Sequence, residues 1–199
     1  MSQSDRLYIF QKKHDKNVKY VFKFVNKGEK IVYTIHEKIR LVATTERRKH
    51  MESIYSVANY FLSKEPMTHK KLQKMCYFAQ AWHMANYDSP LVPNRFEAWV
   101  HGPVSPDLYS KYRGWGWETI PQCKEKVFFE NESIPKFLDQ VYEVYGGYDA
   151  DQLESITHAE EPWKKARNGC SIGTYSRNPI SLIEMRNYYG ERIGKKYAD

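Results

Sequence analysis

The sequence predicts an α+β protein: a mostly helical globule with a small β element, preceded by an N-terminal antiparallel β-meander. Over residues 1–50, apolar and polar residues alternate at every second position, which is typical of half-buried strands. From Met51 onward, apolar residues recur every three or four positions, which is typical of amphipathic helices. We therefore expect two domains, a basic β extension over residues 1–50 and a helical domain over residues 51–199.

Charge is divided unevenly between these two predicted domains. Residues 1–50 contain thirteen Lys or Arg and five Asp or Glu, which gives +8, while residues 51–199 sum to about −1, and the whole chain carries +7. A segment this basic attracts either an acidic protein or a polyanion such as a ribonucleoprotein.

Three cysteines, Cys76, Cys123 and Cys170, are widely spaced and form no CxxC pair, which argues against a disulfide scaffold or a zinc ribbon. No apolar run approaches the roughly 20 residues that cross a bilayer, and the N-terminus lacks the apolar stretch of a signal peptide. We expect a cytoplasmic protein with no metal, no cofactor and no membrane contact.

The predicted meander consists of three short strands within residues 1–50. Two turn-forming segments, at Asp15–Asn17 and Asn26–Gly28, separate apolar runs at residues 7–10, 20–25 and 31–35. In the second run, Tyr20, Phe22 and Phe24 fall on one side, with lysines interspersed. This alternation predicts one buried face and one exposed basic face.

The helical domain is organised around one helix that begins after Thr68, a residue suited to cap it. Its apolar residues recur at helical spacing and predict one buried face: Leu72, Met75, Cys76, Ala79 and Trp82. The turn-forming residues 87–90 end it.

A short strand is expected at Phe96–His101, stopped by Gly102-Pro103, and Val127–Phe129 is a candidate strand to pair with it. A helix then begins at Ser105-Pro106 and runs to about residue 113, with Ser105 as its N-cap.

Other helices are expected on either side of this centre. The first presents Ile54, Val57, Ala58, Phe61 and Leu62. Another begins near Ser133 and presents Phe137, Leu138, Val141 and Val144. Two more are expected at about residues 151–157 and 161–168, and residues 179–193 close the chain, with Ile180, Ile183, Met185 and Tyr188-Tyr189 on the buried side.

The segments KLQKMCYFAQAWHMANYDSPL, FEAWVHGPVSPDLYSKY and LESITHAEEPWKKAR resemble the Panacea domain, also called the SocA-like antitoxin family, over about residues 51–193. The resemblance implies a protein of bacterial or phage genomes, often encoded beside a toxin that it binds. In part of the family it implies a proteolytic adaptor, and other members are phage-associated proteins with no settled role. Residues 1–50 lie outside the shared pattern. We expect them to determine which partner this protein binds.

Catalysis is not expected from this sequence. His83 and His101 form a candidate acid–base pair, but no nucleophile stands in a recognisable context, and hydrogen-bonded packing is the competing explanation. His158 with Glu160 and Glu161 lacks the spacing of a catalytic metal motif, and a charge cluster at a helix start is the alternative. Cys76 belongs to the predicted core.

We predict an antitoxin-like or phage-encoded inhibitor that binds and neutralises a protein toxin stoichiometrically. Tyr112, Trp115 and Trp117 are the candidate partner-binding residues, because aromatic side chains bury a large area for little lost entropy. Core packing is the alternative explanation for each of the three rings.

Binding of a nucleic acid or a ribonucleoprotein is the alternative function. In that function the lysines of the β extension contact phosphates and its rings stack on bases. The same lysines also suit an exposed sheet face or a face that docks an acidic protein. They are Lys12, Lys13, Lys19, Lys23, Lys27 and Lys30.

Overall fold

The computed structural model describes residues 8–12, 19–26, 29–34, 51–171 and 173–194, and for the first three of these ranges it describes the backbone alone. The chain divides into two units, Met1–Lys49 and His50–Asp199. Each unit is considered by itself.

The first unit contains three strands, β1 (Tyr8–Lys12), β2 (Lys19–Asn26) and β3 (Glu29–Thr34). Their backbones pair antiparallel in the order β1-β2-β3. The side chains of these strands lie outside the described residues. The predicted meander, with its buried aromatic face and exposed basic face, therefore stays a prediction.

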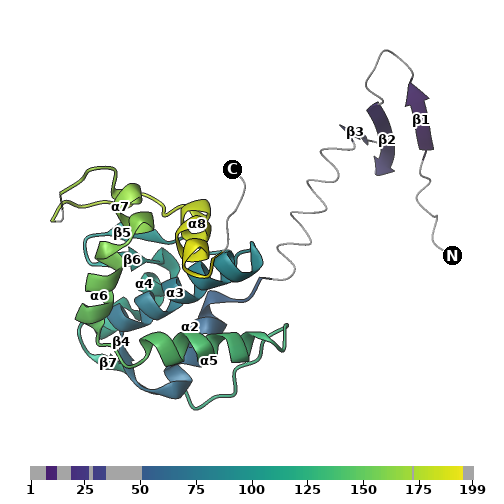
Figure 1. Cartoon of the computed structure of the whole chain (residues 1–199). Coiled ribbons are helices and arrows are strands. Elements are labelled where there is room, and N and C mark those ends of the chain that lie inside the picture. Colours follow the sequence, from purple (N-terminus) through teal and green to yellow (C-terminus); the bar gives the residue numbers. More distant parts are fainter. Residues whose placement is uncertain (1–7, 13–18, 27–28, 35–50, 172, 195–199) are drawn as a thin grey trace. The chain divides into compact units, whose positions relative to one another are not determined.

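The second unit is mostly helical and carries two small two-stranded sheets (Figure 1). Its helices are α2 (Ile54–Lys64), α3 (His69–Tyr87), α4 (Pro106–Tyr112), the 3-10 turn η1 (Arg113–Trp115), α5 (Ile134–Tyr145), α6 (Ala150–Ala159), α7 (Glu161–Arg167) and α8 (Leu182–Arg192). One sheet pairs β4 (Met67–Thr68) with β7 (Thr119–Ile120), and the other pairs β5 (Glu97–Trp99) with β6 (Gly102–Val104). Among the described residues, no helix is long and apolar enough to cross a membrane.

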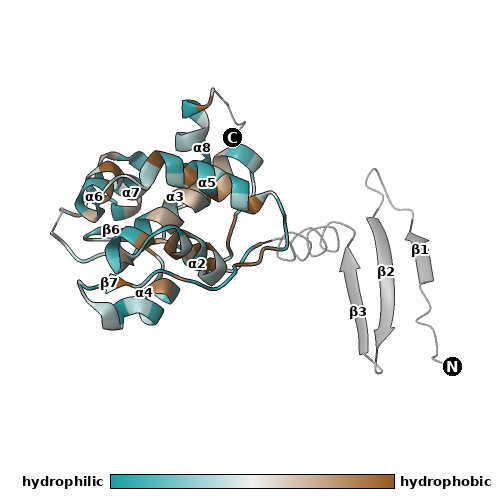
Figure 2. Ribbon diagram, turned by 90° about the horizontal axis from the view of Figure 1, so that it is seen from below, coloured by the Kyte–Doolittle hydropathy of each residue, from teal (hydrophilic) through white to brown (hydrophobic). Residues whose placement is uncertain are grey.

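Helix α3 lies at the centre of the second unit and contacts α2, α4, α5, α6 and α8. It is therefore buried on several sides, beyond the single face that its spacing predicted. Phe78 stacks on Tyr145 of α5 with ring centroids 3.9 Å apart, and Trp82 Nε1 donates to the Tyr145 hydroxyl at 2.9 Å. Figure 2 shows hydrophobic residues on α2, α3 and α5, interspersed with hydrophilic ones.

Several predicted elements are confirmed. The buried residues of α2 are Ile54, Val57, Ala58, Phe61 and Leu62. At the start of α3, the N–H of Lys71 donates to Thr68 Oγ1 at 3.2 Å, which makes Thr68 the cap. Helix α3 ends at Asp88, whose φ of 50° lies in the left-handed region.

The buried faces of two later helices differ from the prediction. In α5 Val144, which was predicted to be buried, is exposed, and Tyr145 is buried. In α8 Ile183 is exposed, while Met185 and Tyr189 are buried. In both helices the buried face lies one or two residues away from the predicted one. The position of the neighbouring helices, and not hydrophobicity alone, decides which residues are buried.

The predicted strand at residues 96–101 is shorter than expected, and the predicted strand at Val127–Phe129 is wrong. The chain folds back after Trp99 through a two-residue turn, so that β5 pairs with β6 and Trp99 lies opposite Gly102. Because β5 finds its partner within a few residues, residues 127–129 are not needed to pair with it, and they adopt no strand; Phe129 instead packs against Tyr60 with ring centroids 5.6 Å apart.

Candidate functional site

A pocket of about 390 Å³ opens beside the N-terminal end of α3, and we call it the α3 pocket. Its lining combines aromatic and basic side chains and contains no carboxylate. The lining residues are Thr68, His69, Lys70, Gln73, Lys74, Trp99, Val100, His101, Val104, Tyr109, Arg113, Gly116, Trp117 and Tyr175.

One wall of the α3 pocket is a helix face. His69, Gln73 and their neighbours Lys70 and Lys74 recur four residues apart, so α3 presents them together. Gln73 also fixes the start of the next wall: its Nε2 donates to the carbonyl oxygen of Ser105 at 3.2 Å, and its Oε1 accepts from the N–H of Ser105 at 2.8 Å. These two bonds hold the first residues of α4 against α3.

Lys74 places a buried amino group in this pocket. Its side chain is fully covered, at 1% exposure, and Nζ donates to the carbonyl oxygen of Pro103 at 3.3 Å. Gly102, with φ at 91°, leaves room for it, because a Cβ there would lie 2.6 Å from Lys74 Cε. Burial lowers the pKa of Lys74 to about 7, with attraction to Glu154 opposing the shift and repulsion from Lys70 adding to it. Perturbed lysines of this kind concentrate at functional sites.

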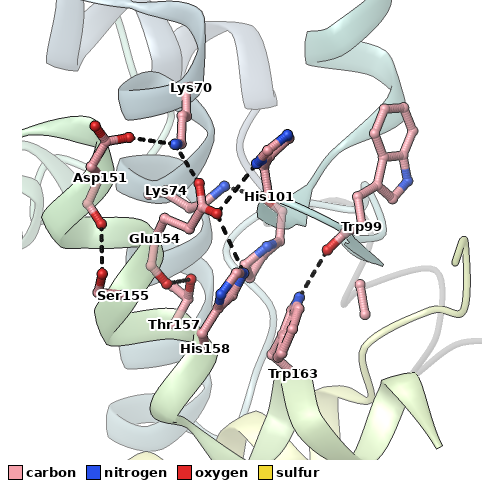
Figure 3. Close-up of polar contacts among 12 residues, drawn as sticks. Lys70, Lys74, Trp99, His101, Asp151, Glu154, Ser155, Thr157, His158 and Trp163 are labelled. Carbon is pink, nitrogen blue, oxygen red and sulfur yellow. Dashed lines mark hydrogen bonds and ion pairs between the residues drawn. The ribbon is translucent and has the colours of Figure 1, made fainter. Parts of the chain in front are cut away.

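A cluster of charged side chains lies beside the pocket (Figure 3). Lys70 pairs with Asp151 at 2.6 Å and with Glu154. Glu154 Oε1 also accepts from His101 Nδ1 at 3.3 Å and lies 3.8 Å from His158 Nε2. Burial alone would raise the pKa of Glu154, but the hydrogen bonds from Lys70 and His101 outweigh burial and lower it. Glu154 is therefore an ionised carboxylate that pairs with Lys70 and accepts a hydrogen bond from His101.

Another part of the pocket lining is aromatic. Trp99 and Tyr109 contact each other with ring centroids 4.9 Å apart, and His69 lies 5.4 Å from Tyr109. Burial, together with the nearby charge of Lys74, lowers the pKa of His69 to about 4, so its ring is neutral. Tyr175 adds an exposed ring at the edge. This wall suits an apolar or aromatic group.

Two comparisons with known proteins assign the family. A family model described as "Antitoxin SocA-like, Panacea domain" matches residues 72–164. Antitoxin SocA of Caulobacter vibrioides (strain NA1000 / CB15N) is 30% identical over 131 residues, which are 57% of this chain and 70% of that protein. The chain belongs to the Panacea domain family. Its resemblance to this family is thereby confirmed, while solved structures gave no significant match.

Most of the α3 pocket falls inside the Panacea match. Residues 72–164 include Gln73, Lys74, the β5–β6 hairpin, α4 and Glu154. The first residues of α3 and Tyr175 lie outside the match. The pocket is therefore formed mainly by the Panacea domain itself.

The three predicted partner-binding rings differ in position. Tyr112 is 6% exposed, and its hydroxyl donates to Asn59 Oδ1 at 3.3 Å. Tyr112 therefore packs in the core, which was the alternative explanation for this ring. Trp115 is 40% exposed and Trp117 is 78% exposed. Trp117 lines the α3 pocket, and Trp115 does not. Their role in partner binding stays a prediction.

The six lysines predicted to contact an acidic partner or a nucleic acid lie in the first unit, outside the residues whose side chains are described. They also lie outside the Panacea match. They are Lys12, Lys13, Lys19, Lys23, Lys27 and Lys30.

His83 and His101 have different partners in the Panacea domain. His83 Nδ1 donates to the carbonyl oxygen of Ser89 at 2.7 Å, and its ring contacts Phe137. His101 is exposed at the tip of the β5–β6 hairpin and bonds to Glu154. Hydrogen-bonded packing therefore describes His83, while His101 belongs to the pocket.

The segment from His158 to Glu161 joins α6 to α7. The His158 ring stacks on Trp163 with centroids 4.1 Å apart, and Glu160 is buried and accepts from the Tyr189 hydroxyl at 2.6 Å. Within the described residues, no group of three His, Cys, Asp or Glu side chains is placed to hold a metal ion. Burial raises the pKa of the Cys76 thiol well above its usual value, so that this cysteine is a poor nucleophile.

The sequence analysis missed Lys74 and Glu154. Both are charged residues in helices with an apolar face, and such residues are ordinarily solvent-exposed. Lys74 follows Gln73 and precedes Met75 in a helix that neighbours cover on several sides. The sequence analysis placed this helix at the centre of the domain but predicted a single buried face, and Lys74 lies outside the residues predicted for that face.

Proposed function

We propose that this Panacea protein binds a protein toxin stoichiometrically and neutralises it, as an antitoxin or a phage-encoded inhibitor. The observation that carries the proposal is its 30% identity to Antitoxin SocA over 70% of that protein. Neutralisation by binding requires a surface and no catalytic group.

The surface we propose for the toxin is the rim of the α3 pocket. Trp117 is exposed there, and Tyr175 lines the same pocket. Exposed aromatic rings beside a concave surface are typical anchors of protein interfaces. Arg177, within 5.5 Å of the Tyr175 ring, adds a positive charge to this rim.

The test is co-purification with the product of the neighbouring gene, using the full chain. We expect Trp117→Ala to reduce the retained partner about tenfold or more, as truncation of an interface anchor does. Phe128→Ala is the matched control, since Phe128 is also an exposed ring, at 72%, and lies outside the pocket lining. Failure of the unaltered chain to retain that partner, or to relieve its toxicity, would contradict the proposal.

A proteolytic adaptor is the more specific form of this function, and it makes a separate prediction. An adaptor lowers the amount of toxin in cells that contain the protease, whereas a simple inhibitor protects the toxin in a stable complex. Following the toxin's half-life with and without this chain distinguishes them. A shortened half-life supports the adaptor, and an unchanged or longer one supports the inhibitor.

Binding of a nucleic acid or ribonucleoprotein is the second candidate function. The charge of +8 on residues 1–50 favours it, because lysines that neutralise phosphates release counterions. This function predicts that affinity falls steeply as salt rises and that residues 51–199 alone do not bind. If an unspecific duplex binds the full chain and the fragment equally, this candidate is excluded.

A further inference from the structure

The α3 pocket contains one buried amino group, that of Lys74, with no carboxylate within ion-pair distance among the described residues. Lys70 has two carboxylates, Asp151 and Glu154, within ion-pair distance. Lys74 has none within 4.0 Å among the described residues, and one of its three N–H donors reaches an acceptor, the carbonyl oxygen of Pro103. The other two donors of this buried amino group have no acceptor among the described residues.

The surroundings of Lys74 specify the sign and size of that ligand group. No carboxylate lines the pocket, and Arg113 contributes a second positive charge. A carboxylate carries one negative charge and matches a single buried ammonium. A phosphate ester carries nearly two and is ordinarily held by several cations or by a run of backbone N–H groups.

The rest of the pocket specifies an apolar group beside the anion. The Trp99 and Tyr109 rings form one wall, and Trp117 stands at the rim with most of its surface exposed. An aromatic side chain between such rings gains both buried area and favourable ring contacts.

We infer that the α3 pocket receives a segment of the protein partner in which a carboxylate lies next to an aromatic side chain. The carboxylate bonds to Nζ of Lys74, and the ring contacts Trp99 and Trp117. This inference rests on the proposed function and adds to it the chemistry of the partner. Binding supplies the missing opposite charge to a lysine that the free protein keeps buried.

The first experiment uses two small probes with the full chain. N-acetyl-L-phenylalanine has the ring and the carboxylate, and N-acetyl-L-phenylalaninamide has the ring alone. We expect the acid to bind about tenfold or more tightly than the amide, since hydrogen bonds to charged groups are the stronger ones. Shifts of the tryptophan indole N–H resonances report binding. Equal binding of both probes, or binding of neither, would overturn the inference.

Variants locate the probe in the pocket. Lys74→Met removes the charge with little change in volume and should abolish the preference for the acid. Trp117→Ala should weaken the binding of both probes. Trp115 is an exposed ring outside the lining, so Trp115→Ala should leave the binding of both probes unchanged. Should Lys74→Met fail to fold, comparison of Trp117→Ala with Trp115→Ala shows whether the probe binds in the pocket. Both rings are exposed, so neither substitution should prevent folding. Inorganic phosphate that displaces the acid at equal concentration would indicate a phosphate-bearing ligand and overturn the assignment.

The second experiment separates this inference from the proposed function. The full chain and its Lys74→Met and Trp117→Ala variants are compared for retention of the neighbouring gene product. Retention by the unaltered chain and loss by both variants supports the inference. Equal retention by all three overturns the inference and the assignment of the toxin surface to the pocket rim, and leaves standing the proposal that the chain binds the toxin. No retention by the unaltered chain overturns the proposed function and, with it, the partner segment as occupant.

Discussion

At the scale of single residues, burial shifts two ionisable side chains of the second unit in opposite directions. It lowers the pKa of Lys74 to about 7, and it raises the pKa of Glu160 to about 7 against the opposing hydrogen bond from the Tyr189 hydroxyl. In both cases a covered site disfavours the charged form. The two residues therefore contribute pH dependences of opposite sign to the free energy of unfolding.

Lys74→Met should make the protein more stable at low pH. Because the pKa of Lys74 is lower in the folded state than in the unfolded state, the unfolded chain binds more protons between pH 7 and 10.5, and stability rises with pH over that window. The methionine variant lacks this rise, so we expect it to gain about 1–3 kcal/mol at pH 6 and less at pH 9. Urea unfolding at both pH values measures the effect, with the exposed Lys164→Met as control. A gain independent of pH would contradict it.

Glu160→Gln should have the opposite pH profile. The folded state holds the proton of Glu160 more tightly than the unfolded state, so the native protein loses stability as pH rises from 4.5 to about 7. Glutamine still accepts from the Tyr189 hydroxyl and carries no charge, and we expect a gain of about 1–3 kcal/mol at pH 8 with none at pH 4. Thermal unfolding across this range tests it. The exposed neighbour Glu161→Gln should show no such profile, and a similar profile there would refute the explanation.

At the scale of elements, two helix starts that look alike in the sequence differ in the structure. Thr68 caps α3 through its hydroxyl, but the Ser105 hydroxyl makes no cap bond to α4 and is buried without a partner among the described residues. The Gln73 side chain instead bonds to both the N–H and the carbonyl oxygen of Ser105. Ser105 is therefore the N-cap residue of α4, as predicted, but its side chain makes no capping bond.

This difference predicts unequal effects of two alanine substitutions. Thr68→Ala should cost about 1 kcal/mol, the usual loss for an N-cap. Ser105→Ala should cost less than about 0.5 kcal/mol or stabilise the protein, because it removes a buried polar atom that has no partner. Chemical unfolding of both variants at one pH gives the comparison. Equal losses would show that the Ser105 hydroxyl is bonded in solution.

Elements were predictable where the pattern is local. The spacing in α2 identified its whole buried face, and Thr68 with residues 87–90 bounded α3 closely. The β5–β6 hairpin was not predicted, because its pairing depends on a two-residue turn that bends the chain at His101. Tyr145 displaced Val144 from the core of α5 because Phe78 and Trp82 of α3 meet it there.

At the scale of the whole molecule, we expect the second unit to fold without the first. Residues 51–199 contain the entire hydrophobic core of the described residues, centred on α3. A fragment of residues 51–199 should therefore unfold cooperatively with a midpoint within a few degrees of the full chain's. Calorimetry of both proteins tests this. A fragment that is aggregated, or that unfolds without a transition, would show that residues 1–50 contribute to the core.

The candidate site was predictable only in part, and the reason again lies in distance along the chain. Trp117 was identified as a partner-binding candidate because an aromatic side chain buries a large area for little lost entropy. Lys74, Tyr109 and Trp117 come together in one pocket because α4 and the following turn return to the start of α3. Tyr112, five residues before Trp117, instead faces Asn59 in the core.

The sequence by itself determined the helical periodicity of the second unit, the concentration of positive charge in residues 1–50 and the membership of the Panacea domain family, since each depends on residue order alone. Tertiary structure decided which side chains are covered. It encloses α3 between other helices, leaves Lys74 buried beneath Gly102 and keeps Trp117 exposed at the pocket rim. Burial depends on segments that are distant in sequence, and burial sets both the pKa of a lysine and the surface offered to a partner.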